Sequence, residues 1–279
     1  MGRQLLTHLS DDGRTEKIYC LCRSKTNDLP PRVTVVEGSL ETLGSVRDID
    51  ADVCIHLAAV TNSAKTDDEE VFRVNEKGTA EVVDFCKRNN IGKIVFLSSV
   101  NVYLSEKQAY ADSKLAAEEH IKNSGLEYSI LRCSLVYGKG CPSFEKIIKT
   151  AGLFHIVPVL GNGNAYEQPV FIDEVCESVI SHTFSQQGNK ICGLYGKTKM
   201  TYNEMVKEIS DAIGCKVKLV HLPVKPFRAV ASFCYRYSVP FPMLPEQIAH
   251  MCEDLSCDDM GEIPSSAEEF SENLKKYIR

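Results

Sequence analysis

The first half of the chain contains short apolar runs in which polar and apolar residues do not alternate. Runs of this kind are typical of strands that are buried on both faces of a parallel sheet. They cover residues 17–22, 32–38, 52–59, 93–99 and 128–134. Segments with helical character separate the later runs. The sequence therefore predicts an α/β fold, a doubly wound parallel sheet with helices on both faces.

Two of the intervening segments have clear helical signals. Residues 67–90 begin with acidic side chains, which suit a helix N-terminus, and then carry apolar residues at helical spacing. Residues 109–125 end at a glycine, which is common just beyond a helix C-terminus. We expect both segments to pack on the predicted sheet.

The pattern changes after about residue 140. A loop rich in Gly and Asn covers 161–164, a helix is predicted to begin near Asp173, and a strand is predicted over 216–222. Further helices are expected near 201–213, 224–237, 244–254 and 266–278.

Composition excludes several classes of protein. The net charge of −6 argues against nucleic-acid binding, which requires a basic surface. No apolar run is long enough to span a bilayer and no secretory signal is visible, so we expect a cytoplasmic protein without a membrane partner. The 12 cysteines are scattered through apolar segments without metal-ligand spacing, so we expect reduced thiols and no metal site.

The strongest chemical signal is a tyrosine and a lysine four residues apart, shortly after a strand that ends in two serines. Tyr110 and Lys114 are expected on one helix face, and Ser99 ends the strand before them. A nearby ammonium group lowers the pKa of a phenol, so Tyr110 can act as a general acid or base tuned by Lys114. The same spacing also arises by chance, with a half-buried tyrosine and a solvated lysine.

Six motifs in order give this pair its context. They are HLAA (56–59), VNEKGT (74–79), FLSSVNVY (96–103), YADSK (110–114), LRCSLVYGKG (131–140) and PVFIDEV (169–175). In these motifs the sequence resembles the extended short-chain dehydrogenase/reductase family, which includes nucleotide-sugar epimerases, dehydratases and reductases. The resemblance implies a Rossmann-like dinucleotide-binding domain over 1–150 and a smaller, mixed substrate-binding region over 151–279, interleaved with it.

The same resemblance implies roles for individual residues. Ser99, Tyr110 and Lys114 are the implied catalytic set. Lys114 is also expected to bond the nicotinamide ribose, and Asn75 to support the central strands. The residues implied to bind the cofactor are Gly2, Arg23, Ser39, Leu57, Ala58, Ala59, Asn75, Ser98, Tyr110 and Lys114.

The choice of cofactor depends on the residues after the second strand of the family. Arg23 and Lys25 stand where an acidic residue would bond the free 2′-hydroxyl of NAD, whereas an arginine accommodates the 2′-phosphate of NADP. We therefore expect NADP(H) rather than NAD(H). Ser39 stands where relatives often have an aspartate that touches the adenine.

The chain opens inside a helix, with GRQLLTHL at residues 2–9. In the family a strand and a Gly-x-x-Gly-x-x-Gly loop precede this helix and hold the pyrophosphate. Gly2 matches the last of these glycines, so the sheet is expected to lack its first strand. Three interpretations are open: a longer native protein, a truncated form that binds the dinucleotide poorly, or another segment that fills the gap.

The leading hypothesis is an NAD(P)(H)-dependent oxidoreductase or epimerase that acts on a nucleotide sugar or a similar small alcohol or carbonyl compound. A dehydratase is less favoured, because Val100 and Asn101 follow Ser99 where dehydratases usually carry an acidic pair. The alternative is a non-catalytic dinucleotide-binding protein with an assembly or regulatory role. Relatives often pair through the helix that carries Tyr110, so a homodimer is predicted.

Overall fold

A five-stranded parallel sheet forms the centre of the computed structural model, which describes residues 1–24, 29–61, 66–237, 239, 243, 245–257 and 261–278. Its strand order is β13-β10-β5-β4-β3. The strands are β3 (Val53–His56), β4 (Lys93–Ser99), β5 (Glu127–Cys133), β10 (Lys190–Leu194) and β13 (Gly261–Glu262). All four pairings are parallel, as the buried apolar runs predict.

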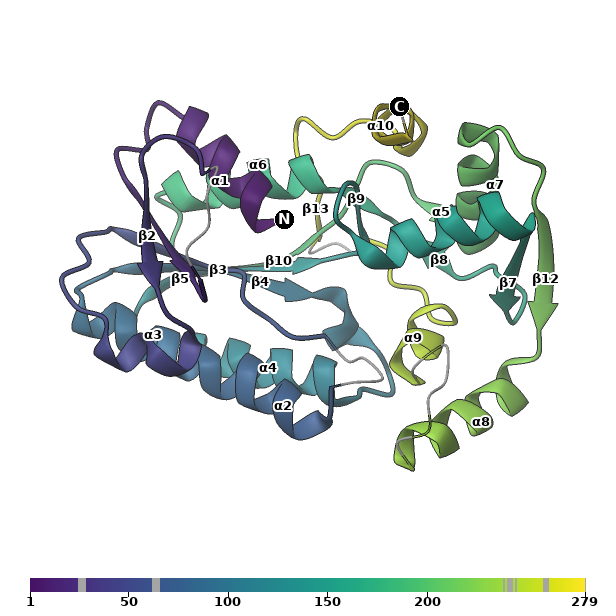
Figure 1. Cartoon of the computed structure of the whole chain (residues 1–279), viewed down its shortest axis with the longest axis horizontal. Coiled ribbons are helices and arrows are strands. Elements are labelled where there is room, and N and C mark those ends of the chain that lie inside the picture. Colours follow the sequence, from purple (N-terminus) through teal and green to yellow (C-terminus); the bar gives the residue numbers. More distant parts are fainter. Residues whose placement is uncertain are drawn as a thin grey trace.

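Helices cover both faces of this sheet (Figure 1). One layer contains α1 (Gly2–Asp11) and α6 (Ile172–Phe184), and the other contains α3 (Gly78–Arg88) and α4 (Ala109–Lys122). Successive residues of β4 serve the two layers: Val95 packs in the core with α1 and α6, whereas Ile94 and Phe96 pack against α3 and α4. Alternate side chains of a strand point to opposite faces, so a strand covered on both sides is apolar throughout.

Two further strands stand apart from the central sheet. Strands β1 (Ile18–Cys22) and β2 (Val33–Glu37) pair only with each other, in parallel. Within the described part of the chain, no strand pairs with β3 on the side away from β4, or with β1 on the side away from β2. Both edges that would border the family's first strand are therefore unpaired among these residues.

The helix that follows β3 is interrupted by a π-helical turn. Helix α2 (Asp68–Phe72) continues through Arg73–Lys77 into α3, so one continuous helical segment covers most of the predicted range 67–90. The side chain of Asp67 accepts a hydrogen bond from the backbone N–H of Glu70 and caps the N-terminus of α2.

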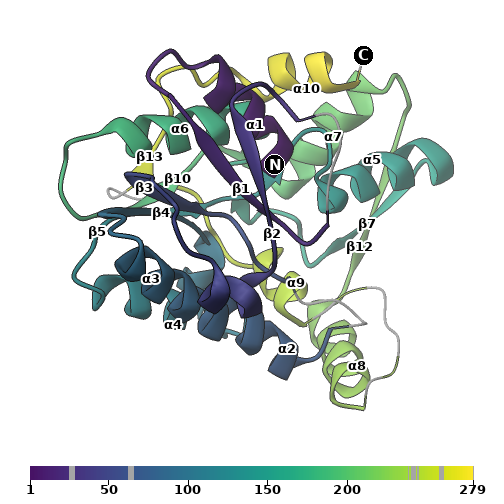
Figure 2. The same cartoon turned by 60° about the vertical axis from the view of Figure 1, so that its left-hand side comes forward.

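The C-terminal part forms a second lobe beside the sheet (Figures 1 and 2). It contains α5 (Pro142–Phe154), α7 (Tyr202–Ala212), α8 (Val224–Arg236), α9 (Pro245–His250) and α10 (Phe270–Ile278). Strand β7 (Ile156–Leu160) pairs in parallel with β12 (Lys218–Leu222). Strand β8 (Tyr166–Glu167) forms a short antiparallel pair with β11 (Met200–Thr201). Strand β6 (Val136–Tyr137) forms a short parallel pair with β9 (Val170–Phe171).

Most predicted elements are present, with small differences in length. The run predicted as a strand over 52–59 forms a strand only to His56, and the helix predicted over 244–254 ends at His250. Sequence reasoning missed α5 and β10. Strand β10 joins the central sheet from the C-terminal part of the chain, next to β5.

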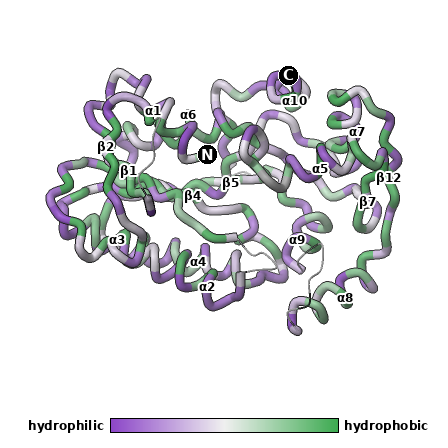
Figure 3. Tube along the Cα trace, viewed as in Figure 1, coloured by the Kyte–Doolittle hydropathy of each residue, from purple (hydrophilic) through white to green (hydrophobic). Residues whose placement is uncertain are grey.

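Apolar segments lie mainly along the strands and the inward faces of the helices (Figure 3). None of the helices in the described residues is long and apolar enough to cross a membrane. The twelve cysteines are free thiols.

Candidate active site

Strand β4 and helix α4 bring the predicted catalytic residues to the carboxyl end of the sheet. Ser99 is the last residue of β4, and its hydroxyl accepts a hydrogen bond from the backbone N–H of Asn101 at 3.2 Å. A 3₁₀ turn over Val100–Tyr103 follows, and α4 begins at Ala109. Tyr110 therefore lies in the first turn of α4, directly beyond the end of the strand.

Tyr110 and Ser99 are hydrogen-bonded through their side chains. Burial, with smaller contributions from the Glu246 and Cys133 side chains, raises the pKa of Tyr110 to about 12, against the opposing effect of the Ser99 hydrogen bond. The sequence predicted a lowered pKa through Lys114, and this is wrong for the protein without ligands. Desolvation disfavours the phenolate more than the nearby groups stabilise it.

Lys114 lies one helical turn after Tyr110, but its ammonium group turns toward the sheet. Its Nζ donates a hydrogen bond to the carbonyl oxygen of Leu97 at 2.6 Å and lies 4.0 Å from the centre of the Phe96 ring. The side chain is only 2% exposed, and burial lowers the pKa of Lys114 to about 7. This lysine can therefore gain or lose a proton near neutral pH.

His56 also packs against Phe96. Its ring stacks on Phe96 at 5.2 Å, and its Nε2 lies 3.0 Å from the hydroxyl of Thr79. Burial, and to a smaller extent the charge of Lys114, lowers the pKa of His56 to about 3. His56 is therefore neutral at physiological pH.

Ser98 lies beside Ser99 in the sequence but faces a different environment. Its hydroxyl donates a hydrogen bond to Glu118 at 2.6 Å, and Glu118 also holds Arg132 through two contacts of 3.0 and 2.6 Å. All three side chains belong to a buried ion-pair network between α4 and the sheet. The structure thus places Ser98 away from Tyr110, although the resemblance implies contact with the cofactor.

The residues after β3 expose a small-residue surface at the same end of the sheet. Ala58 and Ala59 are exposed, and Leu57 is half-buried. Asn75 fixes this segment, because its side-chain amide accepts from the backbone N–H of Val60 at 2.8 Å and donates to the Val60 carbonyl at 2.9 Å. The same amide donates to the Ser113 hydroxyl on α4 at 3.0 Å. Asn75 thus ties the segment after β3 to α4.

Three other implied cofactor residues lie around β1 and β2. Gly2 is the first residue of α1, Arg23 is exposed just after β1, and Ser39 precedes the 3₁₀ helix Leu40–Ser45. Because β1 and β2 do not pair with the central sheet, Arg23 and Ser39 lie beside a different sheet from Ala58 and Ala59. Lys25 lies outside the described residues.

A buried polar network that sequence reasoning missed borders the catalytic set from α9. The side-chain amide of Asn101 donates to Glu246 at 2.8 Å, and its oxygen lies 2.8 Å from Nδ1 of His250. Nε2 of His250 lies 3.4 Å from the carboxylate of Glu167. The spacing of Glu246 and His250, four residues apart after a proline, was the available sequence signal.

Glu246 is almost fully buried, and one of its carboxylate oxygens has no hydrogen-bond partner among the described residues. Burial raises the pKa of Glu246 to about 7, against the Asn101 hydrogen bond and the charge of His250. Although burial lowers the pKa of His250, the Glu167 and Glu246 carboxylates raise it above its usual value. A second group that can exchange protons near neutral pH therefore lies close enough to Tyr110 to influence its pKa.

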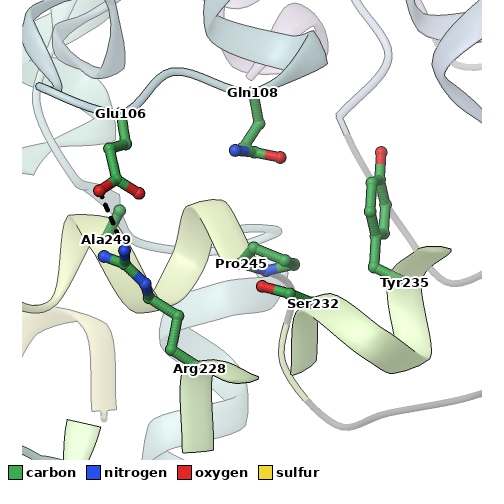
Figure 4. A pocket seen from close by; sticks show the side chains of 7 residues that line it. All are labelled: Glu106, Gln108, Arg228, Ser232, Tyr235, Pro245 and Ala249. Atoms are coloured by element: carbon green, nitrogen blue, oxygen red, sulfur yellow. Dashed lines mark hydrogen bonds and ion pairs between the residues drawn. The ribbon is translucent and has the colours of Figure 1, made fainter. Parts of the chain in front are cut away.

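A cavity of about 270 Å³ lies between α8 and the segment that leads into α4 (Figure 4). Glu106 and Gln108 line one side, and Arg228, Ser232 and Tyr235 line the other. Arg228 and Glu106 form an ion pair of 2.9 Å across the cavity. The hydroxyl of Tyr235 donates to Asp68 on α2. One lining residue, Gln108, lies two residues before Tyr110 in the sequence. The other side of the cavity belongs to the C-terminal lobe.

One group of possible metal ligands occurs within the described residues, at a distance from this site in the sequence. It consists of His182, Cys192 and Glu262. The ammonium group of Lys190 lies 2.8 Å from the Glu262 carboxylate, and His182 lies 3.4 Å from the same oxygen. The ammonium group of Lys190 already neutralises the Glu262 carboxylate. We therefore interpret this cluster as an ion-pair network and not as a metal site.

The chain is similar to enzymes that are named for sugars attached to a nucleotide or to a lipid diphosphate. It is 27% identical over 198 residues to a putative UDP-glucose 4-epimerase from Methanocaldococcus jannaschii, covering 62% of this chain and 64% of that one. It is 23% identical over 224 residues to an N-acetyl-alpha-D-glucosaminyl-diphospho-ditrans,octacis-undecaprenol 4-epimerase from Escherichia coli O157:H7, covering 69% and 66%. The chain thus matches slightly under two thirds of the length of these relatives.

A solved structure has the same fold over the whole chain. The dTDP-glucose 4,6-dehydratase DesIV from Streptomyces venezuelae, determined with NAD bound, superposes with a TM-score of 0.71 at 19% identity, covering 100% of this chain and 91% of DesIV. The model of the NAD dependent epimerase/dehydratase family matches residues 1–190. This match includes β1 to β5, α4 and the Ser99, Tyr110 and Lys114 positions, so the chain belongs to the NAD dependent epimerase/dehydratase family.

Proposed function

We propose that this protein is a nicotinamide-dinucleotide-dependent oxidoreductase or epimerase that acts on a sugar carried by a nucleotide or by a lipid diphosphate. The hydrogen-bonded Ser99–Tyr110 pair at the carboxyl end of the sheet carries this proposal. Ligands of open α/β sheets bind at this edge. The two relatives described above are named for UDP-glucose and for a sugar diphosphate linked to undecaprenol, an isoprenoid alcohol.

The residues present fit the nicotinamide half of such a cofactor. The exposed Ala58 and Ala59 leave room for a flat ring system against the end of β3, and Lys114 is placed to bond a ribose once it leaves the Leu97 carbonyl. A bound nicotinamide dinucleotide supplies the acceptor or donor of the hydride.

The side chains of this protein handle the proton. Ser99 donates or accepts a hydrogen bond at the substrate oxygen and orients it toward Tyr110. The Tyr110 hydroxyl then gives its proton to a substrate carbonyl, or the Tyr110 phenolate takes the proton of a substrate alcohol. Because the pKa of Tyr110 is about 12, forming that phenolate requires added positive charge, and Lys114 is the nearest source on the same helix face.

A pair of tyrosine variants tests this proposal. Tyr110→Phe is expected to lower turnover by about 10²–10⁴-fold, the usual contribution of a general acid or base, while cofactor binding persists. Tyr128→Phe, on β5, is the matched control and should retain activity. The assay follows absorbance of the reduced nicotinamide for net oxidation or reduction of UDP- and dTDP-hexoses, and chromatographic separation of the hexose epimers for epimerisation, which leaves no net reduced cofactor. Full activity in Tyr110→Phe would refute the assigned role.

We propose NADP(H) as the preferred cofactor, because Arg23 is exposed at the end of β1 with no ion pair to another described residue. A 2′-phosphate would give it a charge-assisted partner. Arg23→Ala is expected to weaken NADP(H) binding by about tenfold and to leave NAD(H) binding unchanged, as measured by isothermal titration calorimetry. Equal losses for both cofactors would contradict this preference.

A non-catalytic role on the same fold is the second candidate. Such a protein would bind a dinucleotide and act through protein contacts. It predicts that Tyr110→Phe has no effect on the cellular phenotype, whereas the enzyme hypothesis predicts the phenotype of a full deletion.

We also propose a homodimer formed through α3 and α4. A groove of about 640 Å³ lies between these two helices. Ala80 and Ala116 line it together with charged side chains, among them Asp84, Lys87 and Glu119, which can pair with opposite charges of a second copy. Size-exclusion chromatography with light scattering tests this, and a monomer at micromolar concentration would refute it.

A further inference from the structure

Helix α8 carries two apolar faces, of which only one is used by the fold. Phe227, Ala231 and Cys234 follow one another at helical spacing and face the interior, where Ala231 packs with Leu160 and Ile248. A fold of this kind needs one such stripe to attach a helix.

The second apolar face points to solvent. Val230, Phe233 and Tyr237 are spaced by three and four residues, so they lie along one side of the helix and its C-cap. They are 50%, 61% and 61% exposed, and the Phe233 and Tyr237 rings contact each other at 4.7 Å. Val239, two residues beyond the C-cap, is also exposed. We call Val230, Phe233 and Tyr237 the α8 face.

The charges of α8 differ in sign from those of the whole chain. The chain has a net charge of −6, yet Val224–Arg236 contains three basic side chains and no acidic one. Arg228 is paired with Glu106, whereas Lys225 and Arg236 form no ion pair with any residue that the structure describes. The α8 face is therefore flanked by free positive charge.

The helix also lies at the outer edge of the molecule. It is at the periphery of the C-terminal lobe in both views of the cartoon (Figures 1 and 2), and polar and apolar segments alternate along it (Figure 3). Its polar side, with Arg228, Ser232 and Tyr235, lines the cavity beside the catalytic set (Figure 4). Only the width of one helix, about 10 Å, separates that cavity from the α8 face.

We propose that the α8 face docks on the surface of an anionic membrane. Exposed aromatic and aliphatic side chains beside lysine and arginine are the pattern of helices that lie in the membrane interface, with the apolar side in the acyl boundary and the basic side at the headgroups. A protein partner would not require unpaired cations at the edge of the patch. Docking in this orientation places the cavity next to the bilayer. The contact involves only the membrane surface and stands independently of the enzymatic proposal.

Another exposed apolar patch supplies the matched control. Leu153 and Phe154 at the end of α5 are 72% and 65% exposed, more than any residue of the α8 face. The nearby Lys149 is paired with Glu145 at 3.8 Å, and Lys146 also has a partner. If exposure alone determined membrane binding, this patch would bind at least as well.

The test is co-sedimentation of the full chain with vesicles of phosphatidylcholine alone, or of phosphatidylcholine with phosphatidylglycerol. We expect binding to the anionic vesicles that weakens as salt is added. In the double variant Phe233→Ser with Tyr237→Ser, the partition coefficient of the protein onto anionic vesicles should fall at least tenfold. Lys225→Gln with Arg236→Gln should lose about fivefold for each charge removed. Leu153→Ser with Phe154→Ser should bind as the unmodified chain does.

Circular dichroism and thermal unfolding of each variant establish that it is folded. Absence of binding to anionic vesicles by the folded unmodified chain would overturn the proposal. So would equal losses in the α5 and α8 variants. Self-association that depends on Phe233 and Tyr237, seen by light scattering without vesicle binding, would assign the α8 face to a second copy of the chain instead.

Discussion

The candidate catalytic edge of the sheet, at the end of β4, and helix α8 use their residues in opposite ways. At the end of β4, polar side chains are buried and bonded: Ser98 to Glu118, Lys114 to Leu97 and Ser99 to Tyr110. On α8, apolar side chains are exposed and contact little besides one another. Each region departs from the rule of apolar inside and polar outside, and such departures accompany function more often than stability.

The buried network should be costly to break. Glu118→Gln removes the charge that pairs with Arg132 and leaves a largely buried guanidinium group without its partner. We expect a loss of about 3–5 kcal/mol in the free energy of unfolding, measured with urea. Glu119→Gln, the neighbouring residue in an exposed pair with Lys122, should change it by less than about 1 kcal/mol. Similar losses in both variants would remove the contrast between buried and exposed charge.

Burying the charged form of Lys114 should lower the free energy of unfolding by an amount that depends on pH. Its pKa falls from 10.5 in the unfolded chain to about 7 in the native protein, so between these values the unfolded chain binds more protons. The free energy of unfolding therefore rises with pH across this window, and the cost is greatest below pH 7.

Lys114→Met removes that cost. At about pH 6.5 the variant is expected to be more stable by a few kcal/mol, and at about pH 10 the gain should largely disappear. Urea unfolding at the two pH values measures the difference. The same gain at both values would mean that the lysine is not desolvated in the native state. Loss of turnover alongside gained stability would mark a trade-off between function and stability.

Glu246 should act on Tyr110 through charge. Its carboxylate is one of the groups that raise the pKa of this tyrosine, so Glu246→Gln is expected to lower that pKa. NMR titration of tyrosine ring carbons measures it, with Tyr110→Phe identifying the signal. Glu253→Gln, whose exposed carboxylate bonds Ser105, should leave the pKa of Tyr110 unchanged.

The α8 face should contribute least to folding. Phe233→Ser is expected to change the free energy of unfolding by less than about 0.5 kcal/mol, because the ring is already exposed in the native state. Ala231→Asp, two residues away and buried, should destabilise the protein by at least 1–3 kcal/mol. A large loss in Phe233→Ser would show that the ring supports the fold and would weaken the contrast with the catalytic edge.

The sequence predicted the parallel sheet and the helices around it because buried strands and amphipathic helices each impose a local pattern. Residues 93–99 form a strand with those bounds, and the helix that carries Tyr110 begins at the predicted residue. The order of the motifs also identified the family. Helix α5 and strand β10 were missed, because short elements without strong caps or long apolar runs give weak local signals.

The sequence by itself therefore determined the fold class and placed Ser99 at a strand end and Tyr110 and Lys114 on one helix, because spacing along a strand or helix fixes which side chains share a face. The family followed from the resemblance in the order of the motifs. Only the tertiary structure decided their electrostatics. Burial raised the pKa of Tyr110 and lowered that of Lys114, and α9 brought Glu246 from more than a hundred residues away. The exposed side of α8 was decided in the same way. Both depend on which surfaces the packed lobes remove from water, and no local sequence pattern contains that information.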